Sequence, residues 1–276
     1  MNIHNHIQHG KGLHTVQGNG EAFEVLLGLF FALIIVSYII GALVTSRRYK
    51  KWPLYRSFFW IIGVFCVASV CIGSLANLAQ WDFKAHMLTH LLLGMLAPLL
   101  FVLAAPMTLL LRILKVTSAR RLSVILKRRY FRFIMDPIVV SILNIGGLWI
   151  LYITELFTMM HHNSLLHFLI HVHVFLAGYF FTLSMIYIEP TPHRTSFVYR
   201  ASVLLIALTF HCILSKYIYA HPPIGVPTVD AEIGGMLMYY GGDAIDIVII
   251  FILCYQWYKV VRPRTAVTIN KFKQSL

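Results

Sequence analysis

Two pairs of histidines lie inside long apolar segments, where ionisable side chains are rare and usually functional. The first pair is His86 and His90, and the second is His167 and His171. The members of each pair are four residues apart, so a helix places both imidazoles on one face, one turn apart. Two imidazoles in this arrangement can bind one metal ion, and imidazole suits copper, zinc, iron and nickel.

Two further polar residues fall near these pairs in the expected topology. His211 lies inside another apolar segment, and Asp230 directly precedes the last one. We therefore predict a metal site made by six residues: His86, His90, His167, His171, His211 and Asp230. Thioether ligands favour Cu(I), and the methionines nearby in the sequence direct the choice toward copper. A hydrogen-bonded, structural role for each histidine is the alternative that the sequence leaves open.

The elements that position these residues are apolar enough to span a membrane. The chain has 276 residues, of which 59% are hydrophobic and 12% charged, with a mean hydropathy of +0.76. A soluble domain would carry about 25% charged residues. Because lipid offers no partners to backbone groups, the spans must be helices of about 20 residues. We predict an all-α bundle of seven transmembrane helices, at roughly 23–45, 57–79, 85–111, 138–156, 165–188, 197–219 and 233–258.

The basic residues predict the orientation of this bundle. Alternate loops and the C-terminal tail hold 20 of the 23 Lys and Arg residues, and the opposite set holds only Lys11 and Lys84. The positive-inside rule then places the N-terminus outside and the C-terminus in the cytoplasm. Both histidine pairs begin their spans on the outer side. The net charge of +13 is explained by this topology, so no nucleic-acid partner is expected.

The chain divides into three predicted parts. Residues 1–22 form a polar, His-rich, flexible extracytoplasmic segment without an evident signal peptide; residues 23–258 form the transmembrane domain; residues 259–276 form a basic cytoplasmic tail. Loop 112–137 is long enough for a short basic helix on the membrane surface. Asp136 and Pro137 predict a helix start, because Asp caps helices and Pro favours their first position. The four cysteines predict no disulfide framework.

Three segments resemble a known family. They are "AHMLTHLLLGMLAPLLFVLAAPMTLLLR" (85–112), "LLHFLIHVHVFLAGYFF" (165–181) and "DAEIGGMLMYYGG" (230–242). Their order and their histidine pairs resemble the CtaG-like family of caa-type cytochrome c oxidase assembly factors. The resemblance covers most of the chain from the second span onward. This sequence has Glu232 and Tyr239 where members of the family often have Gln and Trp.

The resemblance implies a seven-span assembly factor in the bacterial plasma membrane, with copper delivery to the haem–copper oxidase as its role. The implied partners are an oxidase subunit that receives copper, an extracytoplasmic copper donor and the lipid bilayer. We therefore expect a copper-binding metallochaperone and not an enzyme. A haem-b electron carrier and a metal or ion transporter are the alternatives. Asp243 and Asp246, near mid-membrane, are expected to pair with Lys216 or Asn144, or else to relay protons or ions.

Overall fold

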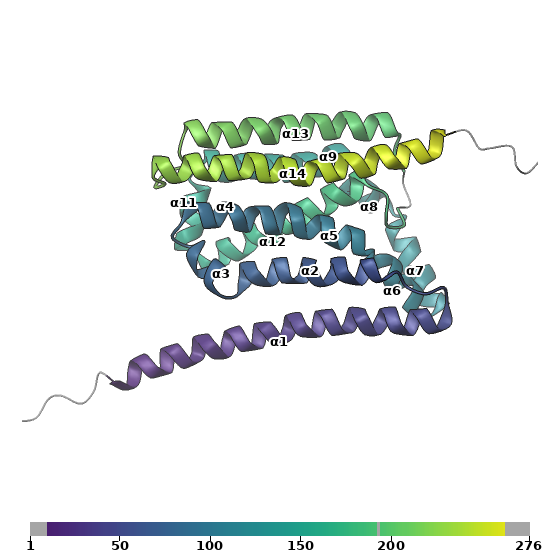
Figure 1. Ribbon diagram of the computed structural model, residues 1–276, viewed down its shortest axis with the longest axis horizontal. Helices are drawn as coiled ribbons and strands as arrows, with labels where there is room; N and C mark the ends of the chain where they lie inside the picture. The colour runs from purple at the N-terminus through teal and green to yellow at the C-terminus, as the bar shows by residue number, and fades with distance from the viewer. Residues whose placement is uncertain (1–9, 192–193, 263–276) are drawn as a thin grey trace, which may run out of the picture.

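The structure, a computed structural model, describes residues 10–191 and 194–262, and this part of the chain is entirely helical (Figure 1). The helices are α1 (Gly10–Arg48), α2 (Leu54–Cys71), α3 (Ser74–Leu78), α4 (Phe83–Leu91), the π-helical η1 (Leu92–Leu96), α5 (Ala97–Ala104), α6 (Pro106–Ile113), α7 (Val116–Leu126), α8 (Arg129–Ile134), α9 (Pro137–Ser141), the π-helical η2 (Ile142–Gly146), α10 (Gly147–Ile153), α11 (Leu156–His162), α12 (Ser164–Met185), α13 (Phe197–Ala220) and α14 (Thr228–Val261).

Within these residues, six helices are long and apolar enough to cross a membrane. A seventh span results if Pro137–Ile153 and Leu156–His162, which meet at a bend of 79°, count as one. The predicted all-helical, multi-pass architecture is confirmed, while the orientation in the membrane stays a prediction. The predicted N-terminal segment lies partly in α1, and residues 1–9 lie outside the described residues, as does the tail from residue 263.

The helices lie side by side in one bundle, with α1 along its edge (Figure 1). α14 packs between α13 and α4, and α12 packs against η1 and α5. The short helices α3 and α11 lie at one end of the bundle, here called the histidine end. The helices α6, α7 and α8 lie at the opposite end. Loop 112–137 is thus helical, as predicted, but forms the end of α6 and two further helices in place of one.

The span that carries His86 and His90 is not a regular helix. Pro98 has no N–H and its ring clashes with the carbonyl four residues earlier, so the helix widens into the π-helical turn η1 before it. The displaced carbonyl of Gly94 lies so close to Gly178 of α12 that a Cβ at Gly178 would overlap it. Gly178 therefore allows the backbones of η1 and α12 to meet.

The same span breaks again at the opposite end, at Ala105, whose φ of 55° is left-handed. The Tyr38 hydroxyl donates to the Ala104 carbonyl at 2.7 Å and fixes this break to α1. The first turn of α6 is capped by the buried Glu189 carboxylate, which accepts hydrogen bonds from the backbone N–H groups of Met107 and Thr108 and from the Thr108 hydroxyl.

Candidate metal site

Four histidines from three helices gather at the histidine end. His86 lies on α4, His161 on α11, and His167 and His171 on α12. The ring centroid of His86 lies 6.2 Å from that of His161 and 6.5 Å from that of His171. The His167 and His171 rings stack at 4.2 Å. We call these four residues the histidine cluster.

Local capping and one sharp bend bring these helices together. The Asp82 carboxylate accepts from the Lys84 N–H and starts α4, and the Asn163 side chain accepts from the N–H groups of Leu165 and Leu166 and starts α12. The 79° bend after Ile153 turns α11 back across the end of the bundle. Without that bend, His161 would lie away from His86.

Hydrogen bonds fix which nitrogen of two of these rings is free. Nδ1 of His161 donates to the Phe157 carbonyl at 2.8 Å, and Nδ1 of His171 donates to the His167 carbonyl at 2.9 Å. A carbonyl oxygen only accepts, so Nδ1 carries the proton in both rings and Nε2 keeps its lone pair. This is the arrangement that protein metal sites use to orient a histidine ligand.

His86 is held by an aromatic shell. Its Nε2 is hydrogen-bonded to the Tyr152 hydroxyl at 3.1 Å, and its ring meets the Phe157 ring edge-on at 5.0 Å. The residue is 5% exposed. These contacts leave Nδ1 as the ring nitrogen available to a further partner.

Two cavities at this end lead to the cluster. One, of about 290 Å³, is lined by His86, His161 and Asp230 among others. The other, of about 460 Å³, is lined by His161, His162 and His167 among others. Trp81, which is 90% exposed, borders both cavities. A small ion can therefore reach the cluster from this end of the bundle.

Asp230 borders the first cavity, but its carboxylate already has a cationic partner. The Lys84 ammonium lies 3.1 Å from Asp230 Oδ1 and 3.9 Å from Asp82 Oδ2. The structure thus brings Asp230 near His86 and pairs it with Lys84. A role as a metal ligand would require Lys84 to move away.

His90 and His211 lie apart from the cluster. Both line a small cavity deeper in the bundle, together with Met95, Asn144 and Asp246 among others. We call this space the inner cavity. Tyr152 contacts both groups: its ring centroid lies 6.2 Å from that of His90, and its hydroxyl is hydrogen-bonded to His86. The six predicted residues therefore do not form one site. His86, His167 and His171 belong to the histidine cluster, His90 and His211 line the inner cavity, and Asp230 is paired with Lys84.

His161 and Tyr152 were missed by the sequence prediction. Residues 157–164 read as an external loop, and the bend that returns α11 to the bundle depends on packing that the sequence does not display. The available signal was the apolar start of this segment, "LFTMMHH". Three of the methionines that favoured copper are fully buried in apolar packing: Met87, Met160 and Met238.

The rings of the cluster lie near one another without converging on one point. Among the described residues, no group of three or more His, Cys, Asp or Glu side chains is arranged to hold a metal ion. Metal–nitrogen bonds of about 2.0 Å would place ligand rings roughly 5–6 Å apart. The observed separations of 6.2 and 6.5 Å are slightly wider, so binding would need small ring rotations.

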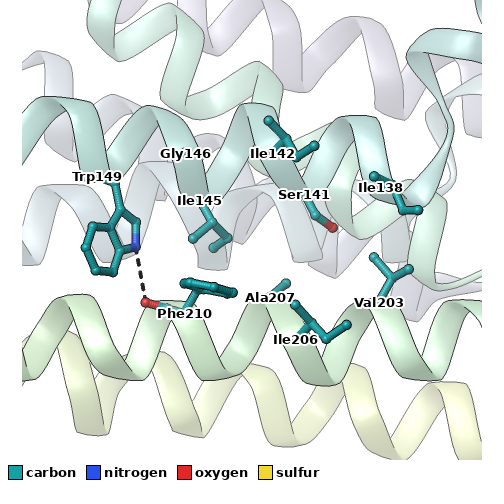
Figure 2. A pocket seen from close by; sticks show the side chains of 10 residues that line it. All are labelled: Ile138, Ser141, Ile142, Ile145, Gly146, Trp149, Val203, Ile206, Ala207 and Phe210. Atoms are coloured by element: carbon teal, nitrogen blue, oxygen red, sulfur yellow. Dashed lines mark hydrogen bonds between the residues drawn. The ribbon is translucent and has the colours of Figure 1, made fainter.

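A cavity of about 500 Å³ lies elsewhere, between α13 and the span formed by α9, η2 and α10 (Figure 2). Its lining is apolar apart from the Ser141 hydroxyl, and the Trp149 indole N–H donates to the Phe210 carbonyl at one end. It offers no ligands suited to a metal ion.

Comparison with known proteins identifies the family. Residues 36–260 match the family model described as cytochrome c oxidase caa3 assembly factor, Caa3_CtaG. Among curated proteins, the "Uncharacterized protein Mb0105" of Mycobacterium bovis is 29% identical over 196 residues, which cover 68% of this chain and 30% of that protein. The "Uncharacterized protein ML1998" of Mycobacterium leprae is 27% identical over 258 residues, which cover 85% of this chain and 39% of that protein.

The chain thus spans roughly a third of the length of these relatives. No solved structure matches it. The family model covers more than three quarters of the chain, and the resemblance predicted from the histidine and glycine motifs is confirmed. This chain belongs to the Caa3_CtaG family, the cytochrome c oxidase caa3 assembly factors.

Proposed function

We propose that this protein is a membrane-embedded assembly factor that binds copper at the histidine cluster and delivers it to cytochrome c oxidase. His86, His161 and His171 would be the ligands, and His167 would support His171 through stacking and its carbonyl. Copper is the cargo here, so the site must release the ion as well as bind it. The positive-inside rule predicts that this end faces the outside, where an extracytoplasmic donor would supply the ion.

The single observation that supports this proposal most strongly is the hydrogen bonding of the rings. His161 and His171 each donate Nδ1–H to a carbonyl and keep Nε2 free, and their ring centroids lie 6.2 and 6.5 Å from that of His86. In protein metal sites a ligand histidine commonly donates its other ring N–H to a carbonyl, because this bond sets both the tautomer and the ring direction.

The chemistry of the donors suits transfer. An all-imidazole site binds copper without the thiolates that would hold it tightly. None of the four cysteines, which lie at positions 66, 71, 212 and 254, belongs to the cluster. The exposure of His161 and the half-burial of His171 leave one side of the site open to a donor or a recipient.

The proposal is tested through the oxidase itself. In the host, the double variant His86→Ala/His171→Ala should assemble less oxidase and leave it deficient in copper, measured by elemental analysis and by the haem spectrum of membranes. The matched control is His173→Ala on the same helix, because Nε2 of His173 bonds the Leu143 carbonyl and the residue lies outside the cluster. Normal copper content of the oxidase in the double variant, at normal protein level, would refute the proposal.

A further inference from the structure

The inner cavity has the size of one small ion or one water molecule. Its volume is about 20 Å³, slightly above the 10–15 Å³ or so that one water-sized body needs. Its lining includes two imidazoles, one thioether and one carboxylate, contributed by His90, Met95, His211 and Asp246. The space lies well inside the bundle, and these four residues come from α4, η1, α13 and α14, respectively.

The polar atoms that border this space lack partners. Nε2 of His90 and both ring nitrogens of His211 are buried without a hydrogen bond in the described part of the structure. His90 is 6% exposed and His211 is 2% exposed. Asp246, 5% exposed, borders the same space. Buried polar groups are almost always satisfied, so this group of orphans indicates an occupant.

Two glycines hold the rings in place. A Cβ at Gly242 would lie 2.6 Å from Cε1 of His211, and a Cβ at Gly94 would lie 3.3 Å from Cε1 of His90. Each imidazole therefore has its Cε1 close to the backbone of a glycine. Such packing limits the rotation by which either ring would find a different hydrogen-bond partner.

We propose that the inner cavity is a second binding site, for a single Cu(I) ion, with His90 Nε2, a His211 ring nitrogen and the Met95 thioether as ligands. Imidazole and thioether together favour Cu(I) over harder ions. Asp246 supplies the negative charge that a monovalent cation needs in a site of low dielectric constant. The inference extends the proposed function, on which it rests, by a second binding site deeper in the bundle than the histidine cluster.

The test uses full-length protein in nanodiscs, titrated anaerobically with Ag(I), a redox-inert probe for Cu(I) sites. His211→Ala and Met95→Leu should each bind one equivalent less than the wild type, while His171→Ala loses a different equivalent from the histidine cluster. Thr182→Val, which removes a polar group from the same cavity without removing a soft donor, should bind as the wild type does. If His211→Ala does not fold, the Met95→Leu variant, which conserves volume, still decides the result.

X-ray absorption on the Cu(I)-loaded wild type gives an independent answer. A sulfur scatterer should be present and should disappear in Met95→Leu. Unchanged Ag(I) stoichiometry in both inner variants, or a structure with only a buried water in the cavity after Ag(I) loading, would overturn the second site and leave the proposed function intact. Absence of all binding in the wild type would overturn both.

Discussion

The imidazole of His86 and the hydroxyl of Tyr152 are hydrogen-bonded at 3.1 Å, although the two residues are 66 positions apart in the chain. Tyr152 is 3% exposed and ends α10, just before the bend that returns α11 to the bundle. The contact therefore couples the direction of the His86 ring to the geometry of that bend. The Tyr152 ring centroid also lies 6.2 Å from that of His90, which lines the inner cavity.

Tyr152→Phe should weaken copper binding and leave the fold intact. The hydroxyl is a partner of a proposed ligand, and loss of such partners lowers metal affinity by about 10–100-fold. The His86 nitrogen left unpaired should also lower the free energy of unfolding by about 1–3 kcal/mol. Competition titration with a copper chelator and thermal unfolding measure the two effects. Tyr240→Phe, at a 69% exposed tyrosine, is the control; equal affinity in both variants would remove Tyr152 from the site.

Lys84→Met should increase the rate at which divalent cations reach the histidine cluster. The change exposes the Asp82 and Asp230 carboxylates at the cavity mouth, and unpaired negative charge attracts cations in a manner that salt screens. Stability should change little, because the ion pair is partly exposed and screened by solvent. Stopped-flow binding of Cu(II) at low and high ionic strength tests this. A rate that does not respond to the substitution at low salt would contradict it.

Gly178→Ala should destabilise the bundle. The added methyl group would overlap the Gly94 carbonyl, which is backbone and cannot rotate aside, so a cost of about 1–3 kcal/mol or more is expected. The matched control is Gly28→Ala, because a Cβ at Gly28 meets nothing within 4 Å. Thermal unfolding in one detergent compares the two. An unfolding midpoint for Gly178→Ala equal to that of the control would mean that η1 and α12 are not in close backbone contact.

Glu189→Gln should lower stability most at acidic pH. Burial raises the pKa of the Glu189 carboxyl, partly offset by the hydrogen bonds from Thr108 and Met107. A raised pKa in the folded state means that this group's contribution to stability is full below its ordinary pKa and declines as pH rises through the raised value. The Gln side chain cannot titrate, and its amide would face a backbone donor. The difference in unfolding midpoint between wild type and variant should therefore narrow from pH 4 upward, and a widening difference would contradict the raised pKa.

Much of the fold followed from the sequence because membrane burial is a local property. Hydrophobic runs located most spans to within a few residues, but the predicted span 57–79 is too long, because α2 ends at Cys71 and Gly73, with a φ of 87°, turns the chain. The predicted helix start at Asp136 is confirmed by its side chain accepting from the Ile138 N–H. The π-helical turns were not predicted. One of them, η1, directly precedes the turn that contains Pro98, which lacks a backbone N–H, and the other, η2, lies in the next span. A hydrophobic pattern of period 3.6 does not reveal the extra residue of a π-helical turn.

The site was harder to predict because it depends on contacts between distant segments. The i, i+4 spacing correctly placed His86 and His90 on one side of their span, and His86 does face His171. The spacing carried no information on Tyr152, which contacts both His86 and His90, or on the bend that brings His161 close to His86. Asp230 was expected close to the histidine pairs, and it lines the same cavity as His86. The sequence did not show that Lys84 would form an ion pair with it.

The most direct test of the proposed function counts the imidazoles on bound copper. Pulsed EPR of Cu(II)-loaded protein detects the remote nitrogen of each coordinated imidazole. It should be applied in a background where the N-terminal histidines 4, 6, 9 and 14 are replaced by Gln, to exclude binding there. His86→Ala, His161→Ala and His171→Ala should each remove one imidazole signal, and His173→Ala should remove none. Copper that is not retained by the background protein, or a signal unchanged in all three variants, would contradict copper binding at the histidine cluster.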